Sequence, residues 1–174
     1  RRRQPPAEML ALIRAHLAQG KPLIGIRTAS HAFEVRGQKA VTPTTWPDFD
    51  TDILGADYQD HYPAGPGKNT VVHGIPSAAQ HPILNGVHKD FRSTTHLYRS
   101  RDLKPTVTPL LTGVTEDGTS QVEPVAWINQ AEHRRVFYTS LGDPQDFANP
   151  DFRRLLRNAV IWGLDDLVPP ANAH

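Results

Sequence analysis

Polar residues able to carry acid–base chemistry follow directly after a short apolar run near the start of the sequence. Residues 21–33 read KPLIGIRTASHAF, in which Arg27 and His31 come just behind the apolar run. A histidine can transfer a proton near neutral pH, and an arginine can hold an oxyanion or clamp hydroxyl groups. The stretch therefore predicts a site at residues 27–31. The alternative is that Arg27 and His31 only tie down a loop.

Two further segments carry residues suited to the same chemistry. Asp60 and His61 lie nearest to the predicted site in the expected topology, and Asp143 follows a later strand. Either aspartate can orient a histidine or act as a base itself. Together with Arg27 and His31, these residues suit proton abstraction beside a sugar carbonyl, as in isomerisation, epimerisation or elimination.

The elements that position these residues are a helix and a strand. Residues 5–20 predict a helix, with Pro5-Pro6 at its start and Gly20 at its end. The strand follows at residues 21–26, and a run this short with an internal glycine is typical of a buried strand in a parallel sheet. Open α/β sheets bind ligands just past the carboxyl ends of such strands, which places residues 27–31 at the site.

The rest of the chain alternates between further strand and helix patterns. A hairpin is expected from the strands 124–128 and 135–140, and a helix from Asn149-Pro150, which suits a capped start, to Leu164. Further strands are expected at 70–75, 91–99 and 106–112, and a short helix at 48–54. This alternation predicts a single α/β domain.

The long irregular segment 32–62 includes the aromatic residues Trp46, Phe49, Tyr58 and Tyr62. Loops of this length in compact domains are often functional, and sugars stack on aromatic faces. The segment is therefore either a lid over a carbohydrate or a loop held down by its own aromatic side chains.

Composition excludes several classes of function. The 174 residues carry a net charge of +1, which favours neither nucleic acid nor an acidic membrane surface as a partner. The chain has no cysteine, so it has neither disulfides nor a thiol nucleophile. We expect no membrane insertion because no apolar run approaches 20 residues. The compartment stays open between cytoplasmic and exported.

Four segments in register, GIRTASHAF, HPIL-N-G, PVAW and RVFYTSLGDPQDF, resemble the ThuA-like (trehalose utilisation) family. This family is similar to the class I glutamine amidotransferases. The resemblance implies a flavodoxin-like three-layer α/β/α sandwich with a mostly parallel central sheet. It also implies one domain over residues 1–174, with its core at about 5–167.

Three departures from the family pattern matter. Family members usually begin with a strand–helix–strand unit that this chain lacks, so we expect a second copy or a neighbouring domain to cover the sheet edge. Amidotransferases carry their cysteine in a Gly-x-Cys turn, where this chain has Gly25-Ile26-Arg27. Arginine is a permanent cation and no nucleophile, so glutaminase chemistry does not carry over. The family's frequent Leu-Gly-His stands here as Leu141-Gly142-Asp143.

The resemblance implies a domain that acts on or binds a sugar or keto-sugar by acid–base chemistry, with a small-molecule carbohydrate as partner. The alternative is a non-catalytic sugar-binding or interaction module, and a metal-dependent hydrolase is a weaker third option. We expect no metal and no cofactor, since no histidine pair has helical ligand spacing. His96 and Tyr98 occupy a family motif and are expected to line the pocket. The predicted catalytic residues are His31, His61 and Asp143, and the predicted substrate-binding residues are Arg27, Thr28, Ser30, Asp60 and Tyr98.

Overall fold

The two segments with helical periodicity form the two long helices. In the computed structural model, which describes residues 4–37 and 39–169, these are α1 (Ala7–Ala18) and α2 (Pro150–Gly163). The side chain of Asn149 caps α2 by accepting a hydrogen bond from the Asp151 backbone N–H at 2.9 Å. Both predicted helices are confirmed. Among the described residues, no helix has the length and apolar character needed to cross a membrane.

Eight strands and six short helical turns make up the rest of the described chain. The strands are β1 (Leu23–Ile26), β2 (Asp57–His61), β3 (Asn69–Gly74), β4 (Asp90–His96), β5 (Tyr98–Arg101), β6 (Val107–Thr115), β7 (Glu123–Asn129) and β8 (Val136–Thr139). The helical turns are η1 (Arg27–His31), η2 (Asp50–Leu54), η3 (Pro76–Ala78), η4 (Pro82–Leu84), η5 (Ala131–His133) and η6 (Pro144–Ala148). Sequence analysis missed β2, and the strand expected at 91–99 is divided at Leu97 between β4 and β5.

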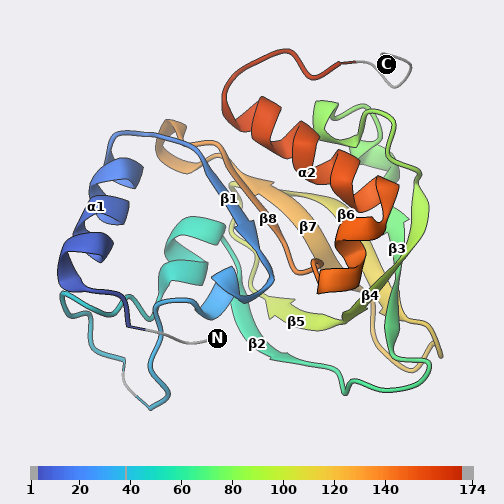
Figure 1. The fold of residues 1–174 in the computed structure, drawn as a ribbon, viewed down its shortest axis with the longest axis horizontal. Helices are drawn as coiled ribbons and strands as arrows, with labels where there is room; N and C mark the ends of the chain where they lie inside the picture. The colour runs from blue at the N-terminus through green and yellow to red at the C-terminus, as the bar shows by residue number, and fades with distance from the viewer. Residues whose placement is uncertain (1–3, 38, 170–174) are drawn as a thin grey trace.

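The strands form a six-stranded sheet in the order β1-β8-β7-β6-β3-β4 and a separate antiparallel pair of β2 with β5 (Figure 1). The α/β class is confirmed, but the mostly parallel sheet is wrong. The β1–β8 pairing is the single parallel one among the five in the large sheet. Parallel neighbours need a long crossover connection, usually a helix, and the chain from β3 to β8 contains strands and short helical turns but no α-helix.

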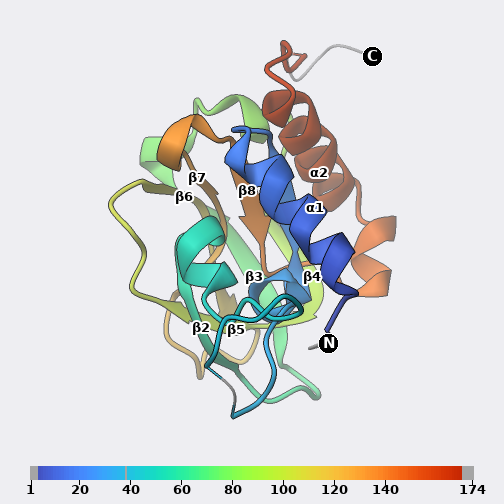
Figure 2. The same cartoon turned by 90° about the vertical axis from the view of Figure 1, so that its left-hand side faces the viewer.

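Both faces of the sheet are covered, and each carries its own apolar core. Side chains alternate between the faces of a strand, so Phe137 of β8 packs with Phe152 and Leu155 of α2. Its neighbour Tyr138 packs on the other face, with Leu54 of η2. Figure 2 shows α2 and η2 on opposite sides of the sheet.

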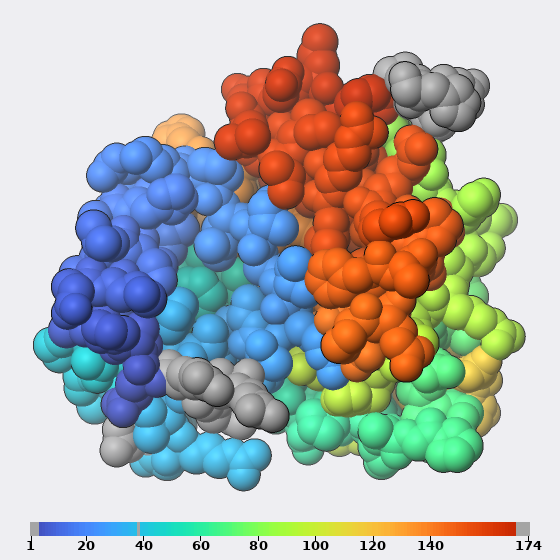
Figure 3. Space-filling view, viewed as in Figure 1, coloured from blue at the N-terminus to red at the C-terminus, as the bar shows by residue number. Residues whose placement is uncertain are grey.

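β1 lies at one edge of the sheet, and β8 is its one strand partner in the described chain. In the space-filling view, residues of β1 and the following turn are visible in the hollow between α1 and α2 (Figure 3). The expected cover of this edge by a second copy or a neighbouring domain stays a prediction.

Candidate functional site

The turn after β1 holds a non-glycine residue in a conformation that such residues rarely adopt. Arg27 has a φ of 50°, in the left-handed region. Its carbonyl oxygen accepts hydrogen bonds from the hydroxyls of Tyr138, at 2.7 Å, and Ser30, at 3.3 Å. Burial raises the pKa of Tyr138, which keeps its hydroxyl a donor. Because strained residues persist where the surroundings hold them and cluster at functional sites, this turn marks a candidate site.

A cavity of about 410 Å³ opens beside the turn, and its lining comes from three parts of the chain. Five of the predicted site residues line it: Arg27, His31, Asp60, His61 and Tyr98. Sequence analysis did not assign a chemical role to the remaining lining residues, which are Arg36, Tyr58, Gln59 and His96.

The pairing of β2 with β5 brings the histidines of the site together. His61 lies opposite Tyr98 in this register, so it reaches His96 at the end of β4. The rings of His61 and His96 meet edge to face with centroids 4.6 Å apart. On the other side of Tyr98, the rings of Tyr58 and His31 pack with centroids 4.5 Å apart. The cavity thus has a wall of packed histidine and tyrosine rings.

Three predicted residues do not line this cavity. Ser30 contacts the Nδ1 atom of His31 at 3.1 Å and the Arg27 carbonyl, so it organises the turn. Thr28 lies within the turn and is half-buried. Asp143 contacts a residue of the lining instead, because its carboxylate lies 4.0 Å from the Arg27 Nη2 atom.

A buried carboxylate places the loop that carries Asp143. Asp146 accepts hydrogen bonds from Ser93, Thr94 and Thr95 of β4 and from the backbone N–H groups of Gly142 and Asp143. Gly142 has a φ of 117°, and a Cβ atom there would lie 2.6 Å from the Ile26 side chain. Glycine is needed at this position because the loop passes so close to the end of β1.

Burial and the neighbouring charges favour the neutral form of His96. Burial lowers the pKa of His96, and the charges of Arg27 and His61 lower it further, against the opposing effect of Asp143. Burial also raises the pKa of Tyr98, so its phenol stays protonated. At the exposed Asp60, a hydrogen bond from the His61 backbone lowers the pKa and keeps the carboxylate charged.

One donor of the site lacks a protein partner. The Nη1 atom of Arg27 is buried and makes no hydrogen bond within residues 4–37 and 39–169. Buried donors are normally paired, so an oxygen of a bound ligand is a natural partner for this atom. Within the same described ranges, no group of three or more His, Asp or Glu side chains is arranged to hold a metal ion.

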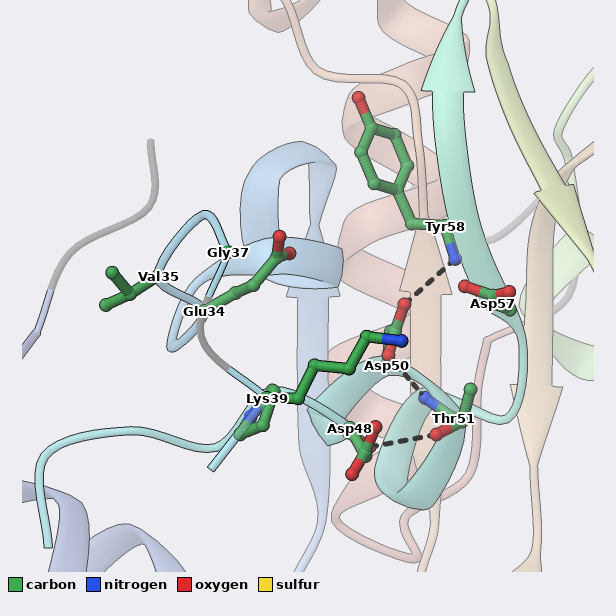
Figure 4. Close-up of a pocket in the computed structure, with 10 residues that line it drawn as sticks. Glu34, Val35, Gly37, Lys39, Asp48, Asp50, Thr51, Asp57 and Tyr58 are labelled. Atoms are coloured by element: carbon green, nitrogen blue, oxygen red, sulfur yellow. Dashed lines mark hydrogen bonds between the residues drawn. The ribbon is translucent and has the colours of Figure 1, made fainter. Parts of the chain in front are cut away.

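A second cavity, of about 490 Å³, adjoins the first, and Tyr58 lines both. Its polar lining is mainly acidic, with Glu34, Asp48, Asp50 and Asp57 (Figure 4). Asp50 accepts hydrogen bonds from the backbone N–H groups of Tyr58 and Thr51, each at 2.8 Å. The Asp50 carboxylate therefore ties η2 to the start of β2.

The model of the ThuA family, described as trehalose utilisation, matches residues 4–163 of the chain. The chain belongs to the ThuA family. This membership confirms the resemblance carried by the four sequence segments, and the description of the family connects its members with trehalose utilisation. No curated protein matches the chain.

Solved structures share the fold of this ThuA-family chain at low sequence identity. A ThuA-like protein from Bacteroides uniformis matches with a TM-score of 0.66 and 17% identity over 93% of this chain and 65% of its own. One from Parabacteroides merdae matches with a TM-score of 0.61 and 17% identity over 94% and 68%. The chain thus spans about two thirds of these relatives. A β-galactosidase from Rahnella sp. R3 matches with a TM-score of 0.51 and 12% identity over 91% of this chain and 20% of its own.

The tertiary structure also decides between the two interpretations of the aromatic loop in this ThuA-family chain. Phe49 is buried, and Trp46 and Phe33 pack edge-on against it, which supports loop packing. Tyr62 donates a hydrogen bond to Glu123 at 3.0 Å. Tyr58 alone among the four predicted lid aromatics lines the site cavity. The lid interpretation is therefore wrong for Trp46 and Phe49.

Proposed function

We propose that this ThuA-family chain abstracts a proton from the carbon beside a carbonyl group of a keto-sugar. The observation that carries the proposal is the convergence of three histidines, His31, His61 and His96, on one cavity beside the strained turn after β1. Imidazoles are the side chains best suited to proton transfer near neutral pH. The polar lining suits hydroxyl-rich ligands.

The other residues of the cavity fit the binding of a neutral sugar. The charges of Arg27 and Asp143 face each other, and Arg36 and Asp60 both line the cavity. The unpaired Nη1 atom of Arg27 offers a charged donor to a sugar oxygen. Arg27 occupies the turn position at which amidotransferases carry cysteine, so the proposed chemistry proceeds without a covalent step.

The proposal is tested by following proton exchange in D₂O by NMR. Trehalose and a derivative oxidised to a ketone at one ring carbon are incubated with the protein at pH 7.5. We expect deuterium to replace hydrogen at the carbon beside the ketone and trehalose itself to stay unchanged. His61→Ala is expected to slow the exchange by roughly 100-fold or more.

The control for that experiment is His73→Ala. His73 pairs with Asp90 on the exposed surface and lies outside the cavity, so this variant should exchange at the wild-type rate. Exchange at the same rate in wild type and His61→Ala would contradict the proposed role of the site.

A non-catalytic sugar-binding module is the second candidate, and the tyrosine rings of the cavity favour it. Tyr58 and Tyr98 pack with ring centroids 4.9 Å apart and both line the cavity. Such a module would give saturation transfer from the protein to the sugar without any deuterium incorporation. The same NMR samples therefore separate the two functions.

A further inference from the structure

His61 and His96 form a pair whose free nitrogens can be assigned from their partners. Both residues line the cavity, and their rings meet edge to face at 4.6 Å. Each ring uses its Nδ1 atom to contact another protein group. Neither Nε2 atom has a hydrogen-bond partner in the described part of the chain.

The Nδ1 atom of His61 lies 3.1 Å from the backbone carbonyl oxygen of Tyr62. A carbonyl oxygen can only accept, so the ring nitrogen must donate and carry the proton. In the neutral ring, the lone pair then resides on Nε2. His61 therefore presents a base to the cavity.

The Nδ1 atom of His96 has the opposite kind of partner. It lies 3.5 Å from the Nη2 atom of Arg27, and a guanidinium can only donate. Nδ1 must accept, so the proton of the neutral ring sits on Nε2. Asp143 lies 4.0 Å from the same Nη2 atom and helps to hold the guanidinium in place.

We infer that His61 and His96 have opposite roles in proton transfer at this site. The Nε2 atom of His61 is the base, and the Nε2–H group of His96 donates a hydrogen bond to the carbonyl oxygen. Arg27 is the positioning residue that sets the tautomer of His96. The inference rests on the proposed function and names its substrate class, a ketone that carries a hydrogen on the adjacent carbon. In the step, the C–H bond breaks and its proton goes to His61 Nε2. The electron pair forms the C=C bond of the enolate, whose oxygen takes the negative charge and accepts the hydrogen bond from His96.

The surroundings of His96 agree with a neutral donor. Arg27, His61, Asp143 and Tyr98 face its ring. Burial and the charge of Arg27 lower the pKa of His96 against the opposing effect of Asp143, so the ring holds one proton at neutral pH. A neutral imidazole can then stabilise an oxyanion without first giving up a proton to solvent.

The first test measures the tautomers directly and needs no sugar. Long-range ¹H–¹⁵N NMR spectra at pH 7.5 should show His96 as the Nε2–H form and His61 as the Nδ1–H form. In the Arg27→Asn variant, asparagine tolerates the left-handed backbone, but its side chain is too short to donate to His96. The Nδ1–H form of His96 should therefore gain population. An Nδ1–H or cationic His96 in the wild type would overturn the inference.

The second test uses the deuterium exchange of the keto-trehalose derivative. His96→Ala should slow exchange by about 100-fold, while His96→Gln, which keeps an N–H donor, should retain clearly more activity. Added imidazole should restore exchange in His61→Ala and not in His96→Ala, because only the first lacks a base.

The outcomes separate the inference from the proposed function. Wild-type exchange that persists within twofold in His96→Ala would overturn the donor role while the proposed function stands. Rescue of His96→Ala by free imidazole would also overturn it. Absence of exchange in the wild type, with the tautomers as expected, would remove the proposed function and the catalytic roles that rest on it.

Discussion

Two loops support the site, and each is held by a buried carboxylate in a different electrostatic state. Asp146 lies in η6 and places Asp143 behind the cavity, while Asp50 lies in η2 and holds Tyr58 in the cavity wall. Both carboxylates are buried, at 2% and 8% exposure. Burial alone raises the pKa of a carboxyl group, so it pushes both in the same direction.

The two residues differ in the number of donors that reach them. Asp146 accepts six hydrogen bonds, among them three from hydroxyl groups of Ser93, Thr94 and Thr95. Burial raises its pKa, but these hydrogen bonds outweigh burial and leave the pKa below its ordinary value. Asp146 is therefore charged at neutral pH.

Asp50 has two backbone donors and acidic neighbours. Burial raises its pKa to about 6, the N–H groups of Tyr58 and Thr51 oppose that rise, and the charges of Asp57 and Glu34 add to it. The lesson is that donor number, and not burial, decides whether a buried carboxylate stays charged. The difference also predicts that the contributions of Asp146 and Asp50 to the free energy of unfolding change with pH in opposite directions.

The largest expected effect comes from Asp146→Ala. Six donors lose their acceptor, so we expect the free energy of unfolding to fall by about 4 kcal/mol at pH 7, measured by urea denaturation. The lowered pKa contributes stability that is present above pH 4 and lost as the pH falls through the folded-state pKa. The difference between the variant and the wild type should therefore shrink in acid. Asp165→Asn, whose side chain is 79% exposed and whose left-handed backbone asparagine tolerates, is the control and should change stability little. A loss below 1 kcal/mol for Asp146→Ala would show that the network is dispensable.

Asp50→Asn is expected to change the free energy of unfolding by less than Asp146→Ala, and in the stabilising direction as the pH rises. Because the folded-state pKa of about 6 lies above the ordinary 3.8, the carboxyl group costs stability as the pH rises through 4 to 6. A shift of this size corresponds to about 3 kcal/mol, and the asparagine removes it. The stability of the variant relative to the wild type should thus increase between pH 4 and pH 8, by urea denaturation at each pH. A constant difference over that range would contradict the assigned state of Asp50.

The smallest expected effects come from two variants that compare a side-chain donor with a backbone donor. Ser93→Ala removes one hydroxyl donor to Asp146 and should cost about 1 kcal/mol. Thr51→Ala leaves the backbone N–H donor to Asp50 in place, since the threonine hydroxyl bonds to the Asp48 carbonyl. The pH dependence assigned to Asp50 should therefore persist in Thr51→Ala, whereas Ser93→Ala should raise the pKa of Asp146. Direct titration of both carboxyl groups by NMR checks this contrast.

The sequence by itself determined the local elements and pointed to the place of the candidate site. The helices α1 and α2 and the strand–turn at Leu23–His31 follow from periodicity, caps and the abrupt change from apolar to polar residues. These signals are local because helix caps and strand ends involve residues a few positions apart. Five of the eight predicted site residues do line one cavity.

Only the tertiary structure decided how distant segments meet. The antiparallel pairing of most strands, the β2–β5 pair that carries His61 to His96, and the burial of Asp50 and Asp146 all depend on contacts between residues far apart in sequence. No local pattern encodes such contacts, because strand propensity does not specify the partner strand. The proton states of the site follow from those partners, so they emerge from the fold and not from residue types alone.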